Sequence, residues 1–259
     1  MRFDVITLFP EVFAPFLDSG VTRRAYESGL VKVKLWNPRD FADGNYRRVD
    51  DRPFGGGPGM VMLAEPLALC LAAIRAERAS GSEPVVLFSP VGKALTHSGV
   101  ASWSGSQGAV LICGRYEGID QRFIDKHVTH QISLGDFVLS GGEIAAMALL
   151  DAVARLQPGV LNDEGSHQLD SFNPALDGLL DCPHYTRPED WQGQAAPAVL
   201  MSGNHANIER FRREQRLSLT WQQRPELVEQ ARVAGQLTAK DEDFLTTLAT
   251  NLVPNLKLL

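Results

Sequence analysis

Short apolar runs alternate along the chain with stretches in which apolar residues recur at helical spacing. The apolar runs are typical of buried parallel strands. They lie near Phe3, Val31, Val85, Ala109 and Val128, and the helical stretches lie near Val21, Pro66, His97, Asp120 and Ile144. This alternation predicts an α/β protein with a largely parallel sheet.

The pattern changes after the helix predicted over Ile144 to Leu156, which is apolar nearly all round and is therefore expected to be buried. Residues 160–183 are rich in Asp, Gly, Ser, Asn and Pro, a composition typical of a long loop or linker. Helical runs follow at Asn207 to Leu219, Pro225 to Ala234 and Thr238 to Leu252. We expect an α/β domain over residues 1–159, a linker over 160–183 and a helical domain over 184–259.

Three glycine-containing segments each follow a predicted strand: Ser89 to Gly92, Gly114 to Gly118 and Gly135 to Gly142. Open α/β sheets bind ligands at the carboxyl ends of their strands, and glycine lets the backbone approach a ligand closely. These segments therefore predict one binding site. The alternative is that the glycines only make turns.

The motifs that are absent narrow the class of ligand. Neither G-x-G-x-x-G nor G-x-x-x-x-G-K-[ST] occurs in the chain, so the sequence does not support a phosphate cradle. Glu117, Asp136 and Glu143 lie in or beside the glycine segments. Their charge favours a cationic or hydroxyl-rich ligand over a pyrophosphate.

The overall charge argues against indiscriminate binding of nucleic acid, since the chain of 259 residues has a formal net charge of -6. Basic residues nevertheless gather in two places, from Arg39 to Arg52 beside a glycine-rich loop and from Arg187 to Arg224. Either group is also compatible with a merely solvated face. The sequence shows no signal peptide and no apolar stretch long enough to span a bilayer, so we expect a cytoplasmic protein without a membrane partner.

Five motifs together carry a family resemblance. They are Asp50 to Met60 (DDRPFGGGPGM), Cys113 to Asp120 (CGRYEGID), Gly135 to Glu143 (GDFVLSGGE), Gly178 to Pro188 (GLLDCPHYTRP) and Ser202 to Ala206 (SGNHA). With them, in order over nearly the whole chain, the sequence resembles the bacterial tRNA (guanine-N1)-methyltransferases, the TrmD family of the SPOUT superfamily. The resemblance implies a homodimer, an amino-terminal α/β domain with a trefoil knot, and S-adenosyl-L-methionine bound in that knot.

The resemblance also implies which residues line the cofactor pocket. By motif match they are Ser89, Pro90, Gly114, Tyr116, Glu117, Leu134, Gly135, Asp136, Phe137, Val138, Leu139, Gly141 and Gly142. The competing role for Leu134, Phe137, Val138 and Leu139 is the hydrophobic core. The family also has a magnesium requirement, for which Glu117 is the candidate ligand.

Methylation of guanine N1 requires a general base, because the N1 lone pair of the neutral base is not available for attack. By family match the base is Asp170, in Asp170-Ser171-Phe172, and Arg155 holds the negative charge that develops on O6. Without the resemblance, Asp170 is an ordinary loop carboxylate and Arg155 a helix partner of Asp151. In the family, Asp170 reaches the pocket of the partner subunit, so the linker is expected to act as a gate.

The substrate that the resemblance implies is tRNA with guanine at position 37, next to the anticodon, where the preceding guanine is also read. The candidate contacts are Arg52, Gly55, Gly56, Gly57, His184, Arg187, Arg210 and Arg213. One departure is the link Asn173 to Asp177, which is longer than expected in relatives. Two other classes remain open: a nucleotide-cofactor oxidoreductase, disfavoured by the missing dinucleotide motif, and a non-catalytic RNA-binding module, disfavoured by Arg155 and Asp170.

Overall fold

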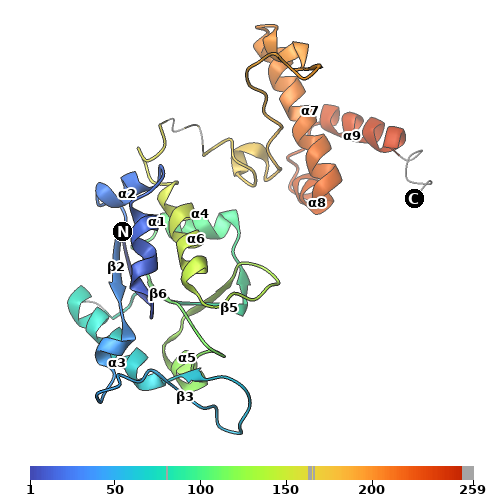
Figure 1. The fold of residues 1–259 in the computed structure, drawn as a ribbon. Helices are drawn as coiled ribbons and strands as arrows, with labels where there is room; N and C mark the ends of the chain where they lie inside the picture. The colour runs from blue at the N-terminus through green and yellow to red at the C-terminus, as the bar shows by residue number, and fades with distance from the viewer. Residues whose placement is uncertain (80, 163–164, 166, 253–259) are drawn as a thin grey trace. The chain divides into compact units, whose positions relative to one another are not determined.

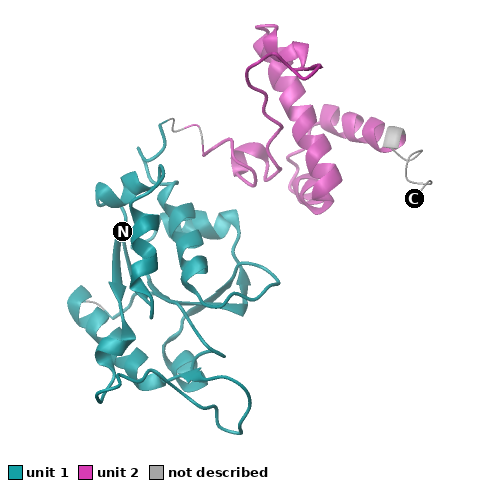
Figure 2. Ribbon diagram, in the orientation of Figure 1, with its two compact units in different colours: residues 1–163 teal, residues 164–259 magenta. Residues whose placement is uncertain are grey.

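The structure is a computed structural model that describes residues 1–79, 81–162, 165 and 167–252 (Figure 1). The chain divides into two compact units, residues 1–163 and residues 164–259 (Figure 2). Each unit has a hydrophobic core of its own. The predicted linker over residues 160–183 is therefore divided, since its first residues belong to unit 1 and the rest to unit 2.

Within its described residues, unit 1 contains a central sheet of five parallel strands in the order β2-β1-β6-β5-β7. The strands are β1 (Arg2–Ile6), β2 (Lys32–Trp36), β5 (Val85–Ala94), β6 (Val110–Ile112) and β7 (His130–Ser133). Each lies within a few residues of a predicted run, so the prediction of a parallel α/β sheet is confirmed. A separate antiparallel hairpin joins β3 (Asp50–Asp51) and β4 (Val61–Met62).

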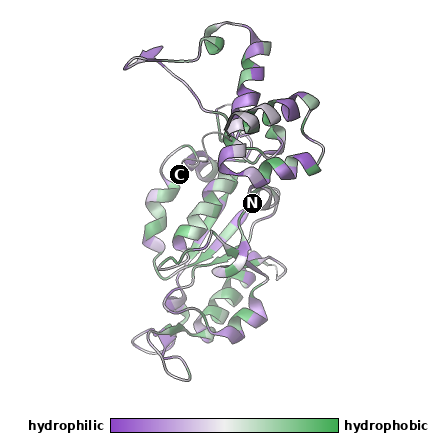
Figure 3. Ribbon diagram, turned by 90° about the vertical axis from the view of Figure 1, so that its right-hand side faces the viewer, coloured by the Kyte–Doolittle hydropathy of each residue, from purple (hydrophilic) through white to green (hydrophobic). Residues whose placement is uncertain are grey.

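Helices cover both faces of this sheet (Figure 1). One face packs against η1 (Pro10–Phe13), α1 (Ala14–Leu17), α2 (Arg23–Glu27), α4 (His97–Ser104) and α6 (Glu143–Ala154). The other face packs against η2 (Pro38–Phe41), α3 (Ala64–Arg78) and α5 (Gln121–His127). Successive strand residues alternate between the two cores, as for Val85 and Val86. Hydrophobic residues, green in Figure 3, predominate in the sheet and the helices packed on it.

The segment Ser89 to Gly92 differs from the prediction, because it is a bulge inside β5 and not a loop after it. Phe88 and Lys93 both pair with Ile132 of β7, so the residues between them leave the register of the sheet. Gly92 allows this, since a Cβ at Gly92 would lie 2.5 Å from the backbone carbonyl carbon of Gln131. The sequence predicted the residues of this segment correctly but not its conformation.

Helix α6 is less completely buried than its apolar sequence predicted. Ala146, Leu149, Leu150 and Val153 are 0% exposed, but Ile144 is 58% exposed. The prediction that the helix is buried all round is therefore wrong at Ile144, because composition alone does not show which side of a helix lacks a neighbour.

A buried carboxylate, Asp4 of β1, is held by three donors and is 0% exposed. It accepts hydrogen bonds from Arg2 Nη2 at 2.7 Å, Trp36 Nε1 at 2.8 Å and Arg78 Nε at 2.6 Å. Burial raises the pKa of Asp4, but the hydrogen bonds from Arg2, Arg78 and Trp36 together outweigh burial, so the pKa lies below its ordinary value. The ionised carboxylate is thus the form that the fold stabilises.

Replacing Asp4 by asparagine is expected to lower the free energy of unfolding by about 3 kcal/mol at neutral pH, because Arg78 loses its buried counter-charge. Since the pKa of Asp4 is lower in the folded than in the unfolded protein, its contribution is present above the unfolded pKa. The contribution is lost as the pH falls through the folded pKa. Urea unfolding at pH 7 and at pH 3 measures both effects. Equal losses at the two pH values, or a loss as small as that of the exposed Asp18→Asn, would contradict this account.

Unit 2 is helical, with α7 (His205–Gln223), α8 (Pro225–Val233) and α9 (Ala239–Leu252) at the three predicted positions. Its shorter elements are η3 (Pro174–Leu176), β8 (Asp190–Trp191), β9 (Gln194–Ala195) and η4 (Ala198–Met201). Part of the predicted linker packs on the helices: Leu179 is 0% exposed in their core, and Leu180 N donates to Thr220 Oγ1 at 3.1 Å. Among the described residues, none of the helices has both the length and the hydropathy that a bilayer-spanning segment requires.

Candidate functional site

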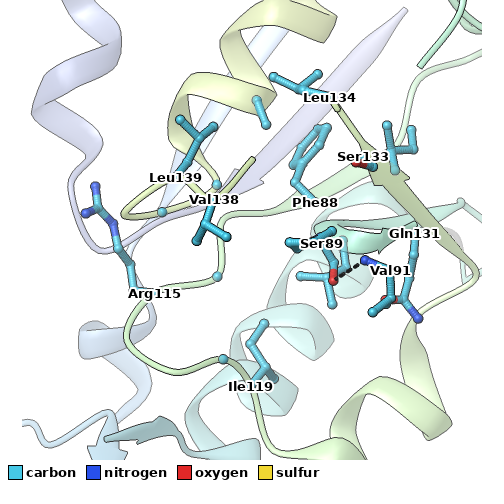
Figure 4. A pocket seen from close by; sticks show the side chains of 18 of the residues that line it. Phe88, Ser89, Val91, Arg115, Ile119, Gln131, Ser133, Leu134, Val138 and Leu139 are labelled. Carbon is cyan, nitrogen blue, oxygen red and sulfur yellow. Dashed lines mark hydrogen bonds between the residues drawn. The ribbon is translucent and has the colours of Figure 1, made fainter. Parts of the chain in front are cut away.

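A cavity of about 540 Å³ lies where the three glycine-containing segments meet (Figure 4). Its walls come from the bulge of β5, the loop after β6 and the loop after β7, at the carboxyl edge of the parallel sheet. The predicted pocket residues that line it are Ser89, Pro90, Gly114, Tyr116, Glu117, Leu134, Gly135, Phe137, Val138, Leu139, Gly141 and Gly142. The segments therefore form one pocket, as the sequence predicted.

Asp136 is the predicted pocket residue that is not among those lining the cavity. Phe137 N donates to Gly135 O at 2.9 Å, which closes a three-residue turn centred on Asp136. Asp136 is exposed at the tip of this turn. The motif did not show this turn, so the prediction that Asp136 lines the cavity is wrong.

The apolar side chains of the pocket divide between two roles. Leu134 and Leu139 line the cavity and also pack against the core of unit 1, so the pocket and the core share them. Phe137 and Val138 are 54% and 84% exposed, so the alternative that they belong to the core is wrong. Figure 4 shows Leu139 and Val138 on one side of the cavity and Phe88, Ser89 and Leu134 on the other.

The loop after β6 carries backbone strain at the rim of the pocket. Tyr116 has φ at 59°, in the left-handed region that a bulky residue rarely adopts, and its side chain is 46% exposed. Strain of this kind costs about 1–3 kcal/mol and gathers at functional sites. This conformation supports a functional role for the loop.

The two glycine loops are fastened to one another through their backbones. Gly142 N donates to Gly114 O at 3.0 Å, and a Cβ at Gly142 would lie only 2.7 Å from Cys113 Cα. Because φ at Gly142 is an ordinary -79°, the position requires glycine for close approach and not for conformational freedom. The start of α6 is thereby placed directly against the end of β6.

Glu143 does not serve the role that its charge suggested. It is 2% exposed, accepts a hydrogen bond from Thr7 Oγ1 at 2.9 Å, and forms an ion pair with Arg115 at 3.0 Å. Its charge is therefore matched inside the protein and is not available to a cationic ligand. With Asp136 also outside the cavity, Glu117 is the one of the three predicted acids that lines it.

Glu117 lines the pocket without the further side-chain ligands that a metal site needs. No group of three or more His, Cys, Asp or Glu residues suited to a metal ion occurs among the described residues. Magnesium prefers six oxygen ligands. If the ion binds at Glu117, its remaining ligands must come from substrates and water.

The β3–β4 hairpin, residues 50–62, extends from the pocket loop. Met62 pairs with Ile119, and Glu117 N donates to Met60 O at 2.9 Å. The glycines at its tip, Gly55, Gly56 and Gly57, have φ of 87°, 76° and 119°, and a Cβ at any of them would meet no atom within 4 Å. They are required for the backbone conformation of the tip and not to accommodate neighbouring atoms of this chain.

Sequence reasoning did not identify two exposed aromatic residues, Phe54 beside the glycines of this tip and Tyr46 before β3. Tyr46 and Phe54 are 92% and 98% exposed. Arg52, a predicted tRNA contact, is exposed two residues before Phe54, and no ion pair of its side chain is seen within the described part of the chain. The missed signal is that both aromatics lie in stretches without the periodicity that buries a side chain. Exposed aromatic and arginine side chains together are typical of surfaces that bind single-stranded nucleic acid.

The predicted tRNA contacts of unit 2 differ in how they are engaged. Arg187 is exposed, and His184 is 78% exposed with Nε2 at 2.8 Å from Asp181. Arg210 pairs with Glu214 at 2.6 Å on the surface of α7. Arg213 is 20% exposed and pairs with Asp177 at 2.7 Å and with Asp241 at 3.2 Å, so it holds the unit together.

The two predicted catalytic residues are both half-buried, Arg155 at the end of α6 in unit 1 and Asp170 in unit 2. Asp181 lies in the same unit as Asp170. Burial raises the pKa of Asp181, but hydrogen bonds from the Cys182 amide and His184 and the charge of Arg216 together outweigh burial, so the pKa lies below its ordinary value. Asp181 is therefore stabilised as an anion within unit 2.

An open parallel sheet with a strained, glycine-walled pocket at the carboxyl ends of its strands defines a ligand-binding protein of the α/β class. The family described as tRNA (Guanine-1)-methyltransferase TrmD matches residues 1–230. The chain belongs to this family, and thus to a family of enzymes.

Similar proteins support this membership over almost the full length. A tRNA (guanine-N(1)-)-methyltransferase of Polaromonas sp. is 78% identical over 254 residues, which cover 97% of this chain and 98% of the relative. Proteins of the same name from Paracidovorax citrulli and Bordetella pertussis are 73% and 57% identical, covering 96% of this chain and 98% of each relative.

Proposed function

We propose that the protein transfers a methyl group from S-adenosyl-L-methionine to N1 of guanine 37 in tRNA. The observation that carries the proposal is the pocket itself. Motif segments far apart in the sequence converge on one cavity, and relatives named tRNA (guanine-N(1)-)-methyltransferase align over its full extent. The test is transfer of labelled methyl groups to tRNA, since a non-catalytic RNA-binding module would bind tRNA without labelling it.

The pocket fits S-adenosyl-L-methionine in size and chemistry. Its volume of about 540 Å³ is in the range of small-molecule sites. Apolar walls from Leu134 and Leu139 suit the adenine ring, glycine backbone groups suit its polar edge, and the Glu117 carboxylate suits a cation or ribose hydroxyls. When bound, this compound supplies an electrophilic methyl group on a positively charged sulfur.

In the proposed mechanism, Asp170 accepts the N1 proton of guanine as the new bond forms. Charge displaced from N1 develops on O6, and the planar guanidinium of Arg155 donates hydrogen bonds to that oxygen. Excluding water from this site strengthens both interactions. The magnesium requirement implied by the resemblance stays a prediction, with Glu117 as the pocket carboxylate that would hold the ion.

The proposed tRNA surface includes the tip of the β3–β4 hairpin in unit 1 and His184, Arg187 and Arg210 in unit 2. Replacing Phe54 by alanine is expected to raise KM for tRNA about tenfold, because a stacked base contributes about 1–3 kcal/mol. KM for the methyl donor should stay unchanged. Steady-state kinetics checks both values, with Leu69→Ala, 42% exposed on α3, as the control. A tRNA KM equal to that of the control would show that Phe54 does not contact tRNA.

We further propose a knotted homodimer in which the partner subunit's Asp170 completes each pocket. The exposed Phe137, Val138 and Ile144 near the pocket rim supply apolar surface for such an arrangement. With the donor well below the weakened Kd of Gly142→Ala, so that Asp170→Ala and Gly142→Ala are each nearly inactive alone, a mixture of the two should then regain activity after exchange of subunits. Each mixed dimer would combine one intact pocket with one intact Asp170. Methyl transfer measured before and after exchange tests this, and an inactive mixture in which mixed dimers are detected would contradict it.

A further inference from the structure

A partly buried ion pair, Glu143 with Arg115, lies against the loop of Ser140, Gly141 and Gly142, which lines the pocket. Glu143, the first residue of α6, is 2% exposed, and its Oε2 lies 3.0 Å from Arg115 Nη2. Thr7, 0% exposed just after β1, donates its hydroxyl to the other oxygen of Glu143 at 2.9 Å. The pair thus joins the start of α6 to the ends of two central strands, β1 and β6.

Arg115 extends this connection to the pocket loop. Its Nη1 donates to Ser140 O at 3.2 Å, and its guanidinium lies over the ring of Phe9 with 4.5 Å between Cζ and the ring centroid. Figure 4 shows the Arg115 side chain directed away from Ser89 and Gln131, on the outer side of the loop that carries Leu139. Arg115 is one of the residues that line the cavity, and its guanidinium contacts the loop that carries Ser140.

Gly141 shows how closely the loop follows the pair. A Cβ at Gly141 would lie 2.2 Å from Arg115 Nε and 2.5 Å from Glu143 Oε2. The loop backbone passes directly over both charged groups. A shift of the pair toward the loop would therefore displace Gly141, which lines the pocket.

The hydrogen bonding of the pair is incomplete. Arg115 Nε and Glu143 Oε2 are buried and make no hydrogen bond with any described residue. Leaving such groups unsatisfied is unfavourable, and a buried ion pair often contributes no more stability than apolar residues of the same size. Stabilisation of the fold therefore does not explain why this pair is present, whereas its contacts with the pocket loop do.

We propose that Arg115 and Glu143 are positioning residues, which hold Ser140, Gly141 and Gly142 where the methyl donor binds. The identity of the donor rests on the proposed function, but the placement of the loop does not. The pair acts before the donor arrives, because its contacts are all within the protein. Loss of the pair should therefore weaken donor binding and loosen the loop even in the free enzyme.

The test compares two carboxylate-to-amide changes in the full chain. Glu143→Gln removes the charge facing Arg115, and Asp4→Asn removes the charge facing Arg78 in the same unit, at a site that does not line the pocket. Calorimetric titration gives Kd for S-adenosyl-L-methionine, thermal unfolding gives Tm, and hydrogen exchange follows the amides of residues 134–142. Thr7→Val, which removes one hydroxyl, is the milder second variant if Glu143→Gln does not fold.

Both amide variants are expected to have a lower Tm, but Glu143→Gln alone should raise Kd about tenfold, because a loop that the pair no longer holds must be ordered when the donor binds. Exchange of residues 134–142 should also become faster in Glu143→Gln alone. Wild-type affinity and exchange in folded Glu143→Gln, or equal changes in Asp4→Asn, would overturn the proposal. If the wild type itself fails to bind the donor, the proposed function fails, and the exchange data still decide whether the pair positions the loop.

Discussion

Replacing Asp170 by alanine is expected to lower the rate of methyl transfer by about 10²–10⁴-fold, the usual contribution of a general base. The physical reason is that guanine N1 attacks the methyl group only if its proton is removed. Binding of S-adenosyl-L-methionine and of tRNA should persist, because neither depends on proton transfer. Single-turnover kinetics with saturating enzyme separates the chemical step from binding.

The control for Asp170→Ala is Asp243→Ala, which removes an exposed carboxylate from α9 in the same unit. It should leave the rate unchanged. A rate close to wild type in Asp170→Ala would mean that another group accepts the N1 proton. A parallel loss of tRNA affinity would instead make Asp170 a binding residue.

Replacing Gly142 by alanine should weaken binding of the methyl donor by about 10²-fold, because overpacking costs up to about 3 kcal/mol and here the cost falls on the pocket loop. The added Cβ would lie 2.7 Å from Cys113 Cα and 3.1 Å from Gly114 N. Both are backbone atoms at the end of a central strand, so the pocket loop must move. Calorimetric titration with S-adenosyl-L-methionine measures the loss.

Gly105→Ala is the matched control, because Gly105 has φ of -87° and its added Cβ would come no closer than 3.9 Å to another residue. It should bind the donor like the wild type. Circular dichroism shows whether Gly142→Ala remains folded. Undiminished affinity in a folded Gly142→Ala would mean that close contact between the two loops does not shape the donor site.

Much of the pocket could be predicted from the sequence because glycines mark places where backbones approach closely. Gly114, Gly141 and Gly142 were identified on that basis, and the structure brings them together. The conformation of Ser89 to Gly92 could not be predicted, since a bulge depends on the pairing of Phe88 and Lys93 with the same residue of β7. The register between two strands depends on both of them and cannot be read from the sequence of one.

Charged residues were the least predictable part of the site. Glu143 follows two glycines in the motif and was expected to attract a cation, yet Thr7, far away in the sequence, and Arg115 enclose it. Arg213 was expected at the tRNA surface, yet Asp177 and Asp241 engage it. A charge in the sequence does not show which partner the fold brings to it, so burial has to be known first.

The competing classes are separated by chemistry at the pocket. The sequence contains neither the dinucleotide nor the phosphate-loop motif, and the walls of the pocket come from a bulge and two glycine loops. Membership in a methyltransferase family weighs against both the oxidoreductase and the non-catalytic module. Tight binding of a nicotinamide cofactor would revive the first of these.

The most direct test of the central claim is methyl transfer from labelled S-adenosyl-L-methionine to two tRNA transcripts that differ only in carrying guanine or adenine at position 37. Mass spectrometry of the digested product identifies the modified nucleoside. The account predicts label in the guanine transcript alone, recovered as 1-methylguanosine. Label in both transcripts, label in a different nucleoside, or no label from an enzyme that binds tRNA would contradict it.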